Sequence, residues 1–278
     1  MNDPGKFILP MLGITVPHPF DDSEWRYEIK WDGYRCQIHW TDRLQVFSRS
    51  GRDLLQPFPD LADLAQLFDV PVILDGELIA WENGAPSYYA LQKRAPLPHR
   101  VVVFDCLYAD GEWLCAKPLA TRLERMHRVV TTQGKIVVAD GIIQKGTALW
   151  QSVRDRGLEG VMAKHLGSPY LPGKRVGYWK KFLVMTRQWT KVFTISQSSE
   201  GQWLWRMSPG NDSRAVIGTL PAPPGWSAEA QDVMTEKGKG SRPIWRLNRP
   251  LVVEVEYREL TTRGKMRHGR IRQWQYHT

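Results

Sequence analysis

The sequence predicts an α+β protein in two parts, and three observations lead to that prediction. The chain has 278 residues, 42% of them hydrophobic, which is enough to bury a core in one large domain or two modest ones. Up to residue 186, short strand-like runs alternate with amphipathic helix-like runs. Beyond that point, strand-like runs follow one another closely. We therefore expect one domain over residues 1–186 and a second over 187–278.

The first part contains strand-like runs rich in β-branched and aromatic residues and bounded by Gly, Asp or Pro. They cover residues 24–31, 34–40, 43–50, 70–81 and 100–109. Asp32-Gly33 is a turn signal, so residues 28–40 are predicted to form a β-hairpin. Helix-like runs cover residues 59–68, 118–130 and 147–157, and the second of these repeats Leu and Met at helical spacing.

The second part contains strand-like runs at residues 191–198, 202–208, 214–220 and 250–260. Residues 222–240 interrupt them, opening as a loop and then allowing one short helix from Ser227 to Lys237. About five strands and one helix in about ninety residues suit a small closed barrel. We expect an OB-fold, with the boundary between the domains at residues 186–189.

Composition restricts the partners and the compartment. An excess of 38 basic over 29 acidic side chains gives a formal charge of +9, which favours nucleic acid first, then anionic membranes or small phosphates. Cys36, Cys106 and Cys115 form no C-x-x-C pair, so neither a zinc ribbon nor a disulfide framework is indicated. No signal peptide and no apolar run of about 18 residues is found. We expect a monomeric cytoplasmic protein with no membrane partner.

Six stretches carry a family resemblance. Lys30-x-Asp32-Gly33-x-Arg35 alone is weak, since K-x-D-G arises by chance in roughly one chain of this length in twenty. It is followed in order by SRSGRDLL from Ser48, LDGELIAW from Leu74, VFDCLYADG from Val103, EGVMAK from Glu159 and YWKKFL from Tyr178. This ordered set resembles the covalent nucleotidyltransferases: ATP-dependent DNA ligases, RNA ligases and mRNA capping enzymes. It is most similar to the ligase modules of bacterial end-joining and repair enzymes, which end in a stretch like LTTRGKMRHGRIRQW.

The resemblance implies a fold and an activity. The fold would be an adenylation (nucleotidyltransferase) domain with antiparallel sheets and flanking helices, followed by an OB-fold. The activity would be ATP-dependent DNA ligation, in which Lys30 takes AMP from ATP, the 5′-phosphate of a nick receives it, and the 3′-hydroxyl displaces it. A lysine that attacks phosphorus must be neutral, and burial and neighbouring positive charge favour the free amine.

The resemblance also implies roles for individual side chains. Phe104 and Met162 would pack on the two faces of adenine, and Glu77 would accept a hydrogen bond from ribose. The residues expected to bind the nucleotide are Glu28, Arg35, Arg49, Glu77, Phe104, Met162, Lys164 and Lys181. Glu159, with Glu77 nearby, would bind Mg²⁺ or Mn²⁺. Taken singly, these residues and their neighbours fit plainer interpretations. Phe104 would be a core residue, Asp75 and Glu77 solvated carboxylates at a strand end, Glu159 an exposed loop acid, and Lys180-Lys181 a surface pair.

Nicked double-stranded DNA is the expected partner, bound without a dedicated helical domain ahead of Lys30. The expected phosphate contacts come from two basic stretches, which otherwise would be solvated loops. Their residues are Lys237, Lys239, Arg242, Arg263, Lys265, Arg267 and Arg270. Trp203, Trp205 and Trp245 are expected either to stack on bases or to pack in the barrel core.

Two departures from the family pattern stand out. In the W-x-K-x-K motif Lys181 fits the first lysine and Leu183 replaces the second, which leaves Lys180 as an alternative. The final R-x-D-K element reads Gln275-Tyr276-His277-Thr278, and Arg267, Arg270 or Arg272 would have to take its place. We therefore expect self-adenylation to be slower than sealing of a pre-adenylated nick.

Other functions remain open on the sequence alone. RNA ligation or capping guanylyl transfer would use the same scaffold. A non-catalytic protein that binds nicks or ends would explain the altered final element but not the intact set of Lys30, Glu77, Glu159 and Lys164.

Overall fold

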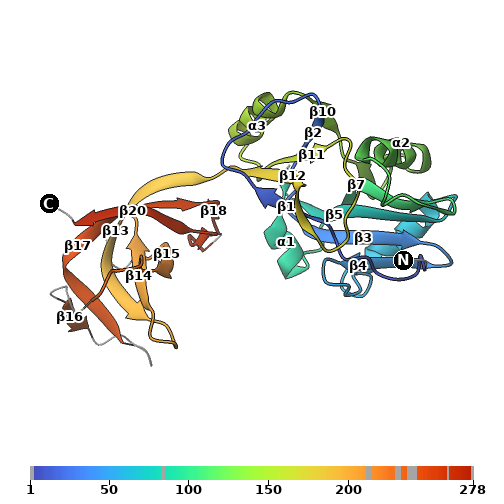
Figure 1. Cartoon of the computed structure of the whole chain (residues 1–278). Coiled ribbons are helices and arrows are strands. Elements are labelled where there is room, and N and C mark those ends of the chain that lie inside the picture. Colours follow the sequence, from blue (N-terminus) through green and yellow to red (C-terminus); the bar gives the residue numbers. More distant parts are fainter. Residues whose placement is uncertain are drawn as a thin grey trace. The chain divides into compact units, whose positions relative to one another are not determined.

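The computed structural model describes residues 3–82, 85–210, 215–228, 233–236, 243–261 and 263–276. The chain divides into two compact units, residues 1–184 and residues 185–278, whose elements are labelled in Figure 1. The sheets are mostly antiparallel, and the helices are few and short. No helix in the described part of the chain has both the length and the hydropathy that a membrane crossing requires.

The first unit contains a five-stranded sheet in the order β1-β12-β11-β2-β10. These strands are Leu12–Thr15, Arg175–Leu183, Gly160–His165, Trp25–Ile29 and Gly141–Ile143. Only β1 with β12 is a parallel pair in this sheet. One face packs with helix α3 (Gly146–Asp155) around an apolar cluster that includes Tyr27, Val161 and Phe182. The opposite face is therefore available for a site.

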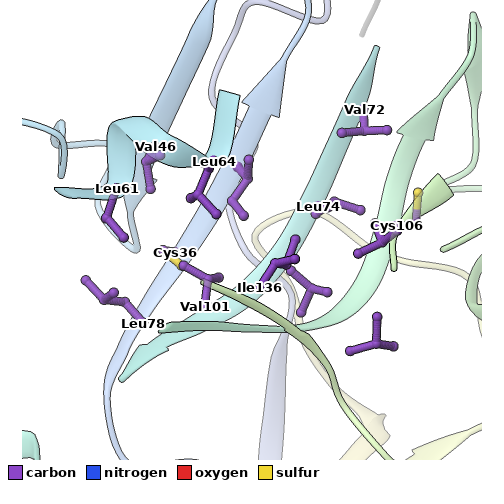
Figure 2. Close-up of a cluster of buried hydrophobic side chains, with 14 of the residues drawn as sticks. Cys36, Val46, Leu61, Leu64, Val72, Leu74, Leu78, Val101, Cys106 and Ile136 are labelled. Atoms are coloured by element: carbon purple, nitrogen blue, oxygen red, sulfur yellow. The ribbon is translucent and has the colours of Figure 1, made fainter. Parts of the chain in front are cut away.

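The second sheet of this unit runs in the order β4-β3-β5-β7-β8, with β6 added to β5 and β9 to β7. Its strands are Leu44–Ser48, Tyr34–Trp40, Val72–Glu82, His99–Ala109, Glu112–Trp113, Ala85–Pro86 and Ile136–Val138. A large core covers one face, where the 3-10 helix η1 (Pro59–Leu67) and helices α1 (Tyr88–Lys93) and α2 (Leu119–Val129) pack. Figure 2 shows this core, with Leu61 and Leu64 of η1 beside Cys36, Leu74 and other strand side chains.

The predicted hairpin over residues 28–40 is wrong, although both of its strands are present. β2 pairs with β10 and β11, whereas β3 pairs with β4 and β5 in the other sheet. The segment from Lys30 to Gly33 therefore crosses from one sheet to the other. A Cβ added at Gly33 would lie 2.1 Å from the carbonyl oxygen of Leu78, so only glycine fits against β5 at this point.

The other strand and helix predictions for the first unit are largely confirmed. The runs at 43–50, 70–81 and 100–109 are β4, β5 and β7, and those at 118–130 and 147–157 are α2 and α3. The run at 59–68 forms a 3-10 helix instead of an α-helix. Helix α1 and the strands β1, β6 and β8–β12 were not predicted. The shortest of these segments show little periodicity.

The second unit is built on a six-stranded sheet in the order β15-β14-β13-β17-β16, with β20 also paired to β17. Its strands are Gly218–Pro221, Trp203–Ser208, Thr186–Gln197, Ile244–Tyr257, Val233–Glu236 and Arg270–Tyr276. The hairpin of β18 (Glu259–Leu260) and β19 (Met266–Arg267) is separate. Inward-facing side chains such as Val192, Trp205 and Val253 form the core of the second unit. The predicted helix over residues 227–237 is wrong at Val233–Glu236, which is strand β16, and residues 229–232 and 237 lie outside the described residues.

A buried ion pair joins helix α2 to strand β7 beside Phe104. Arg122 and Asp105 are both 0% exposed, and the guanidinium donates to the two carboxylate oxygens at 2.7 and 2.9 Å. Arg122 also donates to the carbonyls of Lys117 and Ser168 at 2.7 and 2.8 Å. Because all these groups are withdrawn from water, loss of one partner leaves the other charge unsolvated.

On the second unit, Glu256 of β17 accepts hydrogen bonds from Arg187, Arg270 and Arg272. Its side chain is 4% exposed. Burial would raise the pKa of Glu256, but the hydrogen bonds from Arg272, Arg270 and Arg187 lower it to about 2.

We expect Arg122→Met to lower the free energy of unfolding by about 3 to 5 kcal/mol, because it leaves Asp105 buried without its counter-charge. Arg125→Met on the same helix is the matched control. Arg125 is 29% exposed and pairs with the half-exposed Glu112, so its loss should cost about 1 kcal/mol or less. Urea unfolding followed by fluorescence measures both; equal losses for the two variants would contradict the prediction.

We expect the second unit to lose stability as the pH falls from about 4.5 toward 2. The pKa of Glu256 is depressed in the folded state, so its stabilisation is present above the ordinary value of 4.5 and disappears as the carboxylate protonates near pH 2. The loss should reach up to about 3 kcal/mol. Glu256→Gln should flatten this dependence, whereas Glu259→Gln, which removes a half-exposed carboxylate paired with Arg267, should not. Denaturant titrations from about pH 5 to about pH 2 measure it; a Glu256→Gln curve parallel to that of the wild type would contradict it.

Candidate active site

One face of the five-stranded sheet brings together residues from three strands. Glu28 of β2 lies opposite Met162 of β11, which lies opposite Lys181 of β12. One step along, Lys164 of β11 lies opposite Trp179 of β12. Because side chains alternate along a strand, these residues share one face. Lys30 follows β2 at the end of this face, with its backbone N–H donating to the carbonyl of Gly160 at 2.9 Å.

The second sheet contributes residues from β3, β5 and β7. Arg35 lies directly opposite Glu77, and Asp75 is two residues before Glu77 on the same strand. On β7, Val103 pairs with Gly76 and Asp105 with Asp75, which leaves Phe104 as the extra residue of a β-bulge. A bulge changes the direction of a side chain relative to its neighbours. Phe104 reaches the same cavity as Arg35 and Glu77.

A small cavity of about 70 Å³ collects residues of both sheets and of the crossing segment between them. It is lined by Glu28, Ile29, Lys30, Trp31, Arg35, Glu77, Phe104, Met162, Lys164 and Trp179. Seven of these were predicted to be site residues from the sequence: Glu28, Lys30, Arg35, Glu77, Phe104, Met162 and Lys164. The structure thus places most of the predicted residues, which come from distant parts of the chain, around one cavity.

Lys30 lies at this cavity beside the acidic residue expected to bind metal. Its Nζ is 2.6 Å from Oε1 of Glu159, and the two side chains are 23% and 9% exposed. Glu159 immediately precedes β11, whose first residue, Gly160, accepts the hydrogen bond from the Lys30 backbone. The Lys30 amine is therefore neither turned out to bulk water nor far from Glu159.

Lys164 is almost completely buried in the cavity wall, at 1% exposure. Its ammonium lies 2.6 Å from Glu28, donates to the carbonyl of Phe104 at 3.1 Å, and sits 4.2 Å from the centroid of the Phe104 ring. Burial lowers the pKa of Lys164, and the nearby Glu28 opposes this shift. Glu28 also accepts from Arg26 at 2.9 Å, so its carboxylate is held on both sides.

Arg35 is held by two residues that were not predicted to belong to the site. Nε and Nη2 donate to the two oxygens of Asp75 at 2.6 and 2.5 Å, and the hydroxyl of Tyr170 donates to the same carboxylate at 2.6 Å. Burial alone would lower the pKa of Arg35, but Asp75 raises it above the ordinary value. Asp75 is 0% exposed, which contradicts the interpretation that it is a solvated carboxylate. Its place two residues before Glu77, on the same face of a strand, was the available signal.

Glu77 has an altered protonation equilibrium. Burial raises its pKa to about 7, with Lys30 and Arg35 acting in the opposite direction and Glu159 and Asp75 in the same direction. Among the described residues no cluster of three or more His, Cys, Asp or Glu side chains could hold a metal ion by itself. Mg²⁺ commonly binds through one or two carboxylates together with substrate phosphates, so Glu159 and Glu77 fit that mode.

The structure separates the two lysines that the sequence left as alternatives. Burial lowers the pKa of Lys181, and the positive charges of Lys30, Arg175 and Arg49 lower it further. Lys180 points to the other face of β12, where its Nζ lies 4.3 Å from the Trp25 ring. Arg49 is exposed and does not line the cavity, although its charge reaches Lys181.

The basic residues predicted to contact DNA have different environments. Lys237, Lys239 and Arg242 lie outside the described residues. Arg263, Lys265 and Arg270 are exposed, and Arg267 is half-buried and pairs with Glu259. Three tryptophans were expected either to stack on bases or to pack in the core. Trp205 is 0% exposed and belongs to the core, and Trp203 and Trp245 pack against that core. Core packing is therefore the observed arrangement.

Comparison with known proteins agrees with this geometry. The family model described as "ATP dependent DNA ligase domain" matches residues 14–182. The SPbeta prophage-derived DNA ligase-like protein LigB of Bacillus subtilis is 28% identical, over 96% of this chain and 99% of its own. The multifunctional non-homologous end joining protein LigD of Mycolicibacterium smegmatis is 29% identical over 88% of this chain, but only 35% of that protein is covered.

A solved structure is similar as well. The mycobacterial DNA ligase D complexed with ATP and MES has a TM-score of 0.60 and 26% identity, covering 96% of this chain and 95% of that one. The family model covers more than half of the chain and contains the whole Lys30–Glu159 site. The chain therefore belongs to the ATP-dependent DNA ligases.

Proposed function

We propose that this ligase seals nicks in double-stranded DNA through a covalent AMP adduct on Lys30. The observation that carries this proposal is the position of the Lys30 amine, which lies 2.6 Å from Glu159 at a cavity whose walls hold further cations. A nucleophilic lysine needs such a partly buried position together with groups that neutralise a triphosphate.

ATP would enter with its adenine between Phe104 and Met162. The ammonium of Lys164 lies over the Phe104 ring, so stacking of adenine on that ring would require this ammonium to move outward with the α-phosphate. This movement would release Glu28 from its ion pair with Lys164. A carboxylate freed at this depth can accept a hydrogen bond from the 6-amino group of adenine, a group that guanine lacks, so Glu28 would favour ATP over GTP.

The chemical step needs in-line geometry and charge neutralisation more than covalent help from the protein. The neutral amine of Lys30 would attack the α-phosphorus, forming a nitrogen–phosphorus bond while the bond to pyrophosphate breaks. Lys181, on the same sheet face, and the relocated Lys164 would stabilise the charge that spreads over the phosphate oxygens. Arg35 and Glu77 would position the ribose and phosphate, and Arg49 would approach from outside the cavity.

The two later steps would return Lys30 to its starting state. An oxygen of the 5′-phosphate at the nick attacks the same phosphorus and takes the AMP, which breaks the bond to Lys30. The 3′-hydroxyl then attacks the 5′-phosphate, forms the phosphodiester bond and releases AMP. We assign Glu159 and Glu77 to bind Mg²⁺ or Mn²⁺ together with substrate phosphates. That ion would supply positive charge at the reacting phosphates.

We further assign residues 1–186 as the adenylation domain and residues 187–278 as an OB-fold. The six-stranded antiparallel sheet of the second unit, with one apolar core, supports the latter assignment. The basic side chains Arg263, Lys265, Arg267 and Arg270 would contact DNA phosphates. The enzyme would act as a monomer in the cytoplasm.

Incubation of the protein with ATP and Mg²⁺ should add one AMP, detected by intact-mass spectrometry and located on Lys30 by peptide mapping. Lys30→Arg should carry no adduct, because a guanidinium stays protonated and cannot act as the nucleophile. The same assay with GTP, and sealing assays on nicked DNA and on RNA ends, discriminate against capping and RNA ligation. An adduct on another residue, or a preference for GTP, would sink the proposal.

Lys181→Ala should slow formation of the adduct by about 10- to 100-fold, the usual effect of losing one charge-assisted contact to a phosphate. Lys180→Ala is the matched control, since its ammonium lies against Trp25 on the opposite face of β12. It should change the rate by less than about twofold. Single-turnover kinetics with labelled ATP measure both variants. Equal effects, or a larger one for Lys180→Ala, would contradict the assignment.

A further inference from the structure

Three strands of the second unit place charged side chains in one row. Glu256 of β17 lies directly opposite Arg187 of β13 on one side and directly opposite Arg270 of β20 on the other. The carboxylate accepts from Nε of Arg187 at 3.0 Å and from Nε of Arg270 at 2.5 Å. Directly opposed residues share a face of a sheet. This row therefore lies on the face that turns away from the core formed by Val253 and Val255.

A bulge in β20 adds a third arginine to this row. Ile271 pairs with Val255 and Gln273 pairs with Glu254, so Arg272 is an extra residue with no opposite partner. Bulges commonly redirect a side chain in this way. Here Nη2 of Arg272 donates to both oxygens of Glu256, at 2.9 and 2.7 Å.

The three guanidinium groups use only part of their hydrogen-bonding capacity on Glu256. Their side chains are 60%, 56% and 37% exposed for Arg187, Arg270 and Arg272, whereas that of Glu256 is 4% exposed. Each guanidinium has five N–H donors, so the group has more donors than the hydrogen bonds to Glu256 use. One carboxylate among three guanidiniums leaves a net positive charge on a fixed, planar set of donors.

An exposed aromatic side chain lies beside this cluster. Trp189 is two residues after Arg187 on β13 and is 49% exposed, although large apolar side chains are usually buried. Fixed arginines next to an exposed indole suit a nucleic acid. The arginines can bind the backbone phosphates, and the indole can pack on a base or sugar. An acidic peptide would use the charge but would have less need of the indole.

We propose that Arg187, Arg270 and Arg272 form a binding site for backbone phosphates of nucleic acid, and that Glu256 is the positioning residue that holds them. The identity of the nucleic acid as a nicked duplex rests on the proposed function. Glu256 removes one positive charge from the surface. It also fixes three long side chains, which would otherwise lose conformational entropy on binding.

Two explanations of Glu256 therefore predict opposite changes in DNA affinity. If the carboxylate merely neutralises charge, Glu256→Gln makes the surface more positive and strengthens binding to DNA. If it positions the arginines, Glu256→Gln weakens binding by about tenfold despite the added charge. Glu254→Gln removes the same charge from the same strand two residues away, and as a matched control it should leave binding unchanged or slightly stronger.

Fluorescence anisotropy with a labelled nicked duplex over a range of KCl concentrations measures affinity and its salt dependence. Arg187→Gln and Arg272→Gln change exposed side chains and should each lower the slope of log affinity against log salt by about one. Thermal unfolding of each variant confirms that it is folded. Unchanged slopes in both arginine variants would overturn the proposed phosphate site. This is also the result expected if the surface binds an acidic peptide instead. Equal or stronger binding by folded Glu256→Gln would overturn its positioning role.

The AMP adduct on Lys30 is measured in the same variants and separates this inference from the proposed function. The adduct should form at the wild-type rate in Glu256→Gln. An adduct that forms normally while DNA binding fails to respond to any of the variants refutes only the arginine site. A wild-type protein that forms no adduct refutes the proposed function, while the anisotropy data still decide the arginine site.

Discussion

The close approach of Gly33 to strand β5 is the constraint on which the site depends. The segment from Lys30 to Gly33 leaves one sheet and enters the other, and a Cβ at Gly33 would lie 2.1 Å from the Leu78 carbonyl oxygen. At the start of this segment the backbone N–H of Lys30 donates a hydrogen bond to the carbonyl of Gly160. With both ends fixed, the active face of each sheet lines the same cavity, and Lys30 lies beside it.

The charged side chains of the site are paired with one another. Lys30 pairs with Glu159, Lys164 with Glu28, and Arg35 with Asp75. Buried charges need such partners, because desolvation without compensation is expensive. In the Asp75–Arg35 pair, the carboxylate of Asp75 also accepts a hydrogen bond from the hydroxyl of Tyr170.

The second unit applies the same principle on a surface. Glu256 is buried under three arginines that remain largely exposed, and its pKa of about 2 reflects their hydrogen bonds. In the cavity, carboxylates hold the cations that we propose to bind the nucleotide. On the outer face of β17, one carboxylate holds the arginines that we propose to bind DNA phosphates. In both settings a fixed counter-charge orders long side chains in advance, which lowers the entropic cost of ordering them when a ligand binds.

The sequence by itself determined the family, several of the strands and helices, and most of the residues at the cavity, because short motifs can be recognised without knowing which residues are in contact. It did not predict strands β11 and β12, which carry part of the site. It predicted Lys30, Glu28, Glu77, Phe104, Met162 and Lys164, all of which line the cavity. Only the tertiary structure decided that residues 28–40 are divided between two sheets, since local turn signals do not reveal which strand pairs with which. It also decided that Asp75 and Tyr170 hold Arg35, and that Lys181 faces the site and Lys180 does not. The arginine cluster of Glu256 depends on pairing across three strands and on a bulge, and neither leaves a recognisable pattern along the chain.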